Sequence, residues 1–267
     1  MSKPWYVPSW LSEAVALPSF EVVDTRSAQG RLDYRPKLVT LTDLALFHGH
    51  FCDGLVRAAY AMRALGDRAF AGAPFDRSDL VVVSKNSPCL GDVAAYLSGG
   101  RARFGTHRLD ESLGVGFIIQ VRSTGQTWEV REEPGFFPAI VSAWESALLD
   151  DRLIAEGLLS EEDKAEIVSV NEAVQWDWVR AALLPSRPSD HYAVRIVPDA
   201  SLPKPLFDAR RTDVLNRALS EPVQFISAYE PGPGTPRQIP AGDIKGSLSS
   251  LPAVWRERYL AGPPRRG

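Results

Sequence analysis

The sequence predicts an α+β fold, in which helices pack against a mixed or antiparallel β-sheet. Apolar residues recur at helical spacing after residue 54 and after residue 136, which predicts two amphipathic helices. The β-branched run Leu80–Val83 predicts a short buried strand. An alternating segment at 115–121, followed by a turn, predicts a hairpin that returns over 126–131.

We expect the strand and the hairpin to share one sheet, packed against the helices that start near Asp53 and Pro138. Gly66 should end the first of these helices, and Thr42 should cap a short helix before it. The other expected strands are 20–23, 101–104, 191–197 and 223–229, and the other expected helices are 43–47, 88–97, 161–184, 209–219 and 251–260.

Bulk composition excludes several classes of protein. The chain has 267 residues, enough for one large or two small domains. Its net charge of −3 argues against nucleic-acid binding, and no apolar run is long enough to span a bilayer. The N-terminus lacks the features of a signal peptide, so we expect a cytoplasmic protein. Two cysteines exclude a disulfide scaffold and a four-cysteine cluster within one chain.

The richest stretch for chemistry is residues 47–54, Phe-His-Gly-His-Phe-Cys-Asp-Gly. It holds His48, His50 and Cys52, which are two of four histidines and one of two cysteines. These residues alternate immediately before a predicted helix, with Cys52 or Asp53 as its cap. Imidazole and thiolate are preferred zinc ligands, and a helix N-terminus favours the thiolate. The alternative is that these are ordinary polar residues at the start of a helix.

A second stretch repeats this setting. Ser87 followed by Pro88 is a typical helix opening, which places Cys89 in the first turn. Asp92 lies one turn further on and would face the same way. The alternative is a buried, unreactive thiol. His107 is expected in a loop, where a lone histidine is usually solvated.

These stretches resemble motifs of the FmdE family, which takes its name from formylmethanofuran dehydrogenase. Residues 48–54 are similar to the family signature Gly-His-x-Cys-Pro-Gly, and residues 86–92 are similar to its Cys-x-x-Asp segment. The glycine loop and hairpin that follow, and the segment 191–205, resemble the next blocks of the family in the same order. The likeness therefore covers about residues 40–205.

The resemblance implies an α+β core that often dimerises and a polar site where the two motifs meet. It implies that this site holds a metal, with zinc as the expected ion. The residues carried over are His50, Cys52, Cys89 and Asp92, and His48 is added from its position alone.

The chain departs from the family pattern in three places. Asp53 replaces the family proline and adds a potential ligand or base. Lys85 stands where the family has an acidic residue, and would favour an anionic ligand or lower the pKa of a thiol. No cysteine follows Cys89, so the family's zinc finger is absent. We therefore expect a core over 1–205 with an N-terminal arm, and a C-terminal extension, 206–267, with another role.

Three functions follow as hypotheses. The first is a metal-dependent protein that acts on or carries a small one-carbon or cofactor-like ligand. The second is an accessory or carrier protein for a partner oxidoreductase. The third, ranked last because the two thiols are not in a C-x-x-C arrangement, is metal-free thiol redox chemistry. In each case we expect a homodimer. The expected roles are metal ligation by His48, His50, Cys52 and Cys89, catalysis by Cys52, Cys89 and Asp92, and cofactor binding by Asp53 and Lys85.

Overall fold

The computed structural model describes residues 4–13, 17–23, 36–102, 105–148 and 152–198. They form two compact units. The first contains the described residues up to Glu133 together with 184–198, and the second contains 134–183. The expected boundary at residue 205, the extension 206–267 and the elements predicted within it lie outside the described residues.

The first unit is built on a mixed five-stranded sheet with the strand order β5-β4-β6-β7-β8. Neighbouring strands are antiparallel except β4 and β5, which are parallel. The predicted strand and hairpin therefore do share one sheet. The strands are β4 (Leu80–Ser84), β5 (His107–Leu109), β6 (Gly116–Val121), β7 (Thr127–Glu132) and β8 (Tyr192–Ile196).

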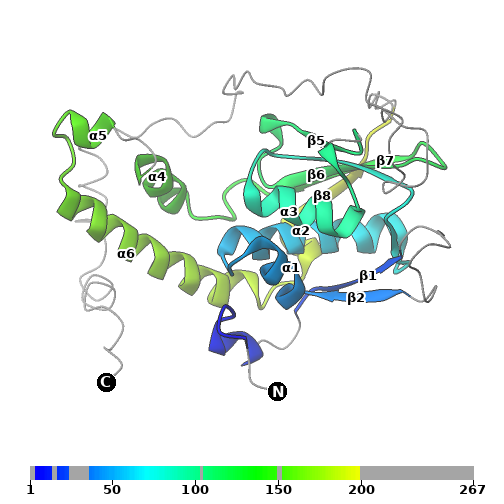
Figure 1. The fold of residues 1–267 in the computed structure, drawn as a ribbon, viewed down its shortest axis with the longest axis horizontal. Helices are drawn as coiled ribbons and strands as arrows, with labels where there is room; N and C mark the ends of the chain where they lie inside the picture. Colours follow the sequence, from blue (N-terminus) through cyan, green and yellow to red (C-terminus); the bar gives the residue numbers. More distant parts are fainter. Residues whose placement is uncertain (1–3, 14–16, 24–35, 103–104, 149–151, 199–267) are drawn as a thin grey trace. The chain divides into compact units, whose positions relative to one another are not determined.

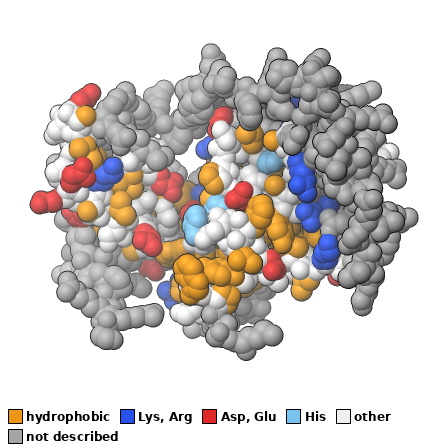
Figure 2. All heavy atoms as spheres, viewed as in Figure 1, with side chains coloured by type: hydrophobic (Ala, Val, Ile, Leu, Met, Phe, Trp, Pro, Cys, Tyr) orange, Lys and Arg blue, Asp and Glu red, His pale blue; other side chains and the backbone are white. Residues whose placement is uncertain are grey.

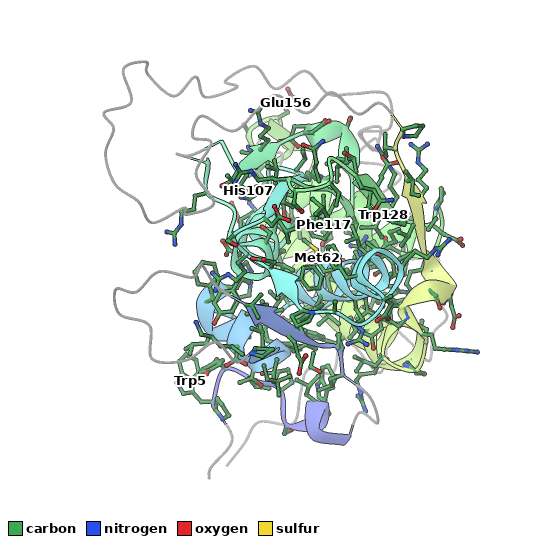
Figure 3. The ribbon with its side chains drawn as sticks, turned by 90° about the vertical axis from the view of Figure 1, so that its right-hand side faces the viewer. Trp5, Met62, His107, Phe117, Trp128 and Glu156 are labelled. Atoms are coloured by element: carbon green, nitrogen blue, oxygen red, sulfur yellow. The ribbon has the colours of Figure 1, made fainter. Side chains whose placement is uncertain are left out.

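Two helices cover one face of this sheet (Figure 1). Helix α2 (Asp53–Phe70) packs on β6, β7 and β8, and helix α3 (Pro88–Ser98) packs on β4 and β5. Met62 of α2 and Phe117 of β6 are fully buried in this layer (Figure 3). Burial of such apolar side chains is the main force that holds the layer together. The predicted α+β class is confirmed.

A smaller three-stranded sheet has the order β2-β1-β3. Strand β1 is antiparallel to β2 and parallel to β3. Helix α1 follows β2 directly and packs against α2 and α3. The remaining elements of the first unit are β1 (Ser19–Val23), β2 (Lys37–Thr40), β3 (Phe75–Asp76), α1 (Leu41–His48), α7 (Pro188–His191) and the 3₁₀ turns Ser9–Glu13 and Glu111–Leu113.

Two predicted helix ends were wrong. Helix α2 runs through Gly66 and ends four residues later. The glycine stands inside the helix because it faces the ring of Phe75, and a Cβ there would lie 2.8 Å from that ring. Helix α1 is capped by Thr40, not Thr42. The Thr40 hydroxyl and backbone N–H both contact the Asp43 carboxylate, and Asp43 N–H donates back to the hydroxyl, forming a capping box.

The second unit is helical. It contains α4 (Ala139–Leu148), α5 (Arg152–Ala155), α6 (Glu161–Trp178) and a π-helical turn (Val179–Leu183). The expected helix at 161–184 is present, and Ser160 caps it by accepting from Asp163 N–H. We expected α4 to pack on the sheet of the first unit; within the second unit it packs against α6. Their shared core contains Phe137, Val141, Trp144, Ala147, Leu159, Ile167, Val170 and Val174.

One predicted strand lies elsewhere. Arg101 and Ala102 are not in a strand, and the strand of this region is β5, a few residues later. Its residue His107 is therefore part of the sheet rather than a solvated loop. Among the described residues, no helix is both long and apolar enough to cross a membrane.

Candidate metal centre

Three helices bring the centre together. His48 is the last residue of α1, and Gly49 ends that helix in the left-handed conformation, with φ of 96°. Cys52 is the N-cap of α2, where its sulfur accepts from Leu55 N–H at 3.4 Å. Cys89 is the second residue of α3, after Pro88. The sequence therefore correctly predicted that both thiols stand at helix N-termini.

The three side chains converge on one point. The sulfurs of Cys52 and Cys89 lie 3.5 Å apart, and each lies 3.7 Å from His48 Nε2. Within the described ranges, these ligand atoms form a group compact enough to hold a metal ion. The two motifs therefore meet at one place, as the resemblance implied.

Asp92 holds the ring of His48 in place. Its carboxylate lies 2.8 Å from His48 Nδ1, and the His48 side chain is only 2% exposed. A carboxylate accepts a hydrogen bond here, so we assign the proton to Nδ1. The lone pair of Nε2 then faces the two sulfurs, which is the arrangement of a metal-ligating histidine with a carboxylate partner.

Gly54 allows the two helix N-termini to meet. A Cβ at this position would lie 2.8 Å from the sulfur of Cys89 and 3.1 Å from its Cβ. Real Cβ atoms do not tolerate such distances, so any other residue would displace Cys89 or the start of α3. The glycine two positions after Cys52 is therefore a geometric requirement of this centre.

The two thiols differ in acidity. A hydrogen bond from the Cys52 thiol lowers the pKa of Cys89 to about 7, against the opposing effect of burial, and the neighbouring His48 ring adds to the lowering. The same hydrogen bond and burial raise the pKa of Cys52. Without metal, Cys89 is therefore the thiol that ionises first.

Asp53 belongs to a buried charged network beside the centre. Its carboxylate lies 3.5 Å from Arg57 Nη1, and the Arg57 guanidinium donates two hydrogen bonds to Glu132, at 2.6 and 3.0 Å. Tyr192 hydroxyl also donates to Glu132, at 3.1 Å. Asp53 follows Cys52 directly in the chain, and its negative charge disfavours ionisation of both thiols.

Two residues expected at the site, His50 as a ligand and Lys85 for cofactor binding, lie outside the ligand group. His50 is exposed, and its ring lies against the ring of His48, with centroids 4.4 Å apart. The alternation that would align His48, His50 and Cys52 does not occur, because His48 is helical and Gly49 turns the chain. Lys85 lies between β4 and α3, and no hydrogen bond or ion pair joins its side chain to another described residue.

His107 was missed by the sequence interpretation. It lies half-buried in β5, with Nε2 2.9 Å from the Ser84 hydroxyl. Burial lowers its pKa, and the charge of Asp92 opposes this. A Cβ built at Gly91 would lie 3.9 Å from His107 Cε1, so His107 lies beside the second motif. The sequence held no specific signal for it, because its partner Ser84 is 23 positions away. Figure 2 shows histidine side chains beside an acidic side chain on a face that also carries hydrophobic side chains.

Fold and site together define an α+β protein with a compact cysteine–histidine centre. The family model FmdE, described as "Molybdenum formylmethanofuran dehydrogenase operon", matches residues 47–186. This match covers more than half of the chain and includes both motifs, and the chain therefore belongs to the FmdE family. The predicted resemblance is confirmed. No curated protein matches the chain.

Proposed function

We propose that this protein binds one divalent transition metal ion, with zinc as the first choice, through His48, Cys52 and Cys89. The observation that carries the proposal is the triangle of ligand atoms. Tetrahedral zinc with bonds of about 2.3 Å to sulfur and 2.0–2.1 Å to nitrogen separates two sulfurs by about 3.8 Å, and sulfur from nitrogen by about 3.6 Å. The corresponding distances here are 3.5 Å and 3.7 Å.

The surrounding residues support the same ion. Asp92 would fix the tautomer of His48 and increase its basicity as a ligand. The N-termini of α2 and α3 would stabilise the two thiolates. Three protein ligands leave one coordination position for water or a small ligand, as in catalytic rather than structural zinc sites.

The ligand at that position defines the role. We propose that the protein acts on or carries a small one-carbon or cofactor-like molecule, beside a partner oxidoreductase. The family description, which names a formylmethanofuran dehydrogenase operon, supports this choice. The proposal includes a cytoplasmic location, where thiols stay reduced and free to bind metal. It also includes a homodimer, which sedimentation at micromolar concentration would test.

A second candidate function is thiol redox chemistry without metal. The 3.5 Å between the sulfurs of Cys52 and Cys89 and their unequal acidity favour it. A disulfide would need the sulfurs to close to about 2.05 Å, and an external oxidant would accept the two electrons and two protons.

Metal analysis of untagged protein, with titration of free thiols, separates the two candidates. Metal binding predicts about one zinc per chain and two thiols that react only after a chelator is added. Cys52→Ser should then cut metal affinity sharply with an unchanged circular dichroism spectrum.

Metal-free protein in which Cys52 and Cys89 form a disulfide reversibly would support the second candidate and overturn the first. A matched control is Ser84→Ala, which alters a buried polar residue outside the ligand triangle. It should leave the metal content near the wild-type value.

A further inference from the structure

We propose that the open coordination position takes an uncharged donor molecule and disfavours anions. This inference rests on the proposed metal binding at His48, Cys52 and Cys89, and adds the chemical class of the ligand. It starts from the charges around the centre. Two thiolates balance a divalent ion, and a histidine that ligates through Nε2 is neutral. The metal and its ligands therefore carry no net charge.

The groups around this neutral centre are mainly acidic. Asp53, in the first turn of α2, is buried, and its charge acts on both cysteines. Asp92 contacts the back of His48 at 2.8 Å. Glu132 is nearly buried as well, with its side chain 9% exposed. Asp53 and Asp92 thus lie at the centre, and Glu132 is connected to Asp53 through Arg57.

One guanidinium, that of Arg57, contacts two of these carboxylates. Arg57 is bound by Glu132 through two hydrogen bonds, and it contacts Asp53 only at 3.5 Å. Together, the three carboxylates and this cation carry a net charge of about −2. The N-termini of α2 and α3 supply about half a positive charge each. About one negative charge stays uncompensated, in a partly buried site where charges interact more strongly than in water.

This balance reverses the expectation from sequence. Lys85, which stands where the family has an acidic residue, was expected to favour an anionic ligand. The structure adds the buried Asp53 and its network, and gives Lys85 no ion pair with the described residues. Among one-carbon compounds, the site would favour an aldehyde, an amide carbonyl or an amine, and would disfavour a carboxylate such as formate.

Cobalt-substituted protein allows a direct test. Cobalt(II) replaces zinc in tetrahedral sites, and its visible absorption reports both the thiolate ligands and the fourth ligand. We would titrate imidazole and azide, which both bind through nitrogen, at about pH 8, where imidazole is mostly neutral. Imidazole should bind at least about tenfold more tightly than azide, since one opposing charge at this range is worth about 1.4 kcal/mol or more.

Three variants locate the cause. Asp53→Asn should raise azide affinity about tenfold and leave imidazole affinity nearly unchanged. Asp67→Asn makes the same change on the same helix, but at an exposed residue paired with Arg63, and should alter neither affinity. Lys85→Gln should not weaken azide binding.

The outcomes are distinct. If no cobalt–thiolate absorption develops, the proposed metal function fails and this inference with it. If the absorption develops and azide binds as tightly as imidazole, the inference alone is overturned. A loss of azide binding in Lys85→Gln would contradict the inference and support the anionic ligand expected from the sequence. The wild-type comparison stands even where Asp53→Asn does not fold.

Discussion

At the residue scale, the absence of a side chain at Gly54 is as important as the ligands. The N-termini of α2 and α3 approach so closely that the Cys89 sulfur occupies the space of a side chain at this position. Gly91, in the first turn of α3, faces no such restriction. A Cβ there would meet its nearest neighbour, His107 Cε1, at 3.9 Å, an ordinary contact.

This difference gives a matched pair of variants. Gly54→Ala should displace Cys89 and reduce the bound metal well below one per chain. Gly91→Ala should keep the metal and raise the free energy of unfolding by roughly 0.5–1 kcal/mol, because alanine suits a helix interior better. Metal analysis and urea denaturation check the two effects. Full metal content in Gly54→Ala would show that the close approach is not required.

The two neighbouring histidines offer a second residue-scale prediction. His48→Gln removes the nitrogen ligand and should reduce zinc affinity more than tenfold. His50→Gln changes an exposed ring that stacks on His48, and should reduce zinc affinity far less. Competition with a colorimetric chelator measures both. Asp92→Asn should fall between them, since loss of a carboxylate partner typically costs 10–100-fold in metal affinity. Equal losses in the two histidine variants would contradict the ligand assignment.

At the scale of elements, α1 delivers His48, and its first turn is set by Thr40. The capping box with Asp43 satisfies N–H groups that would otherwise have no partner inside the helix. Leu41, Leu44 and Ala45 bury the inner face of the same helix. The cap and this face together place the last residue of α1 beside the two cysteines.

Thr40→Ala should therefore lower the free energy of unfolding by about 0.5–2 kcal/mol. Thr42→Ala is the matched control, because Thr42 lies inside α1 and makes no cap; alanine there should be neutral or slightly stabilising. Urea denaturation of both variants gives the comparison. A larger loss of unfolding free energy in Thr42→Ala than in Thr40→Ala would support Thr42 as the cap, as expected from the sequence.

At the scale of the whole molecule, all residues of the candidate centre lie in the first of the two compact units. The same unit holds a buried tyrosine pair that makes its stability sensitive to alkali. Burial raises the pKa of Tyr60 to about 12, and its hydroxyl donates to the Leu184 carbonyl at 3.3 Å. Burial and the charge of Glu132 also raise the pKa of Tyr192.

The sign of the pH effect follows from these shifts. Between about pH 10 and 12, an unfolded tyrosine releases its proton while folded Tyr60 keeps it. The unfolded state is therefore favoured, and the free energy of unfolding should fall as pH rises through this window. Tyr60→Phe should make the fall shallower without removing it, because Tyr192 still contributes. Urea denaturation at a series of pH values measures the slope, and an unchanged slope in the variant would count against the prediction.

The sequence by itself determined the α+β class, most strand positions, both helix N-termini that carry a cysteine, and the family. Local periodicity and capping chemistry are enough for these, since they depend on residues a few positions apart. Tertiary structure decided that His48 rather than His50 meets the thiols, that His107 lies in a strand, and that α4 packs on α6. Each depends on contacts between residues far apart in the sequence, such as His48 with Asp92, 44 positions away. Such contacts follow from how α1, α2 and α3 pack on one another, and no local sequence pattern predicts this packing.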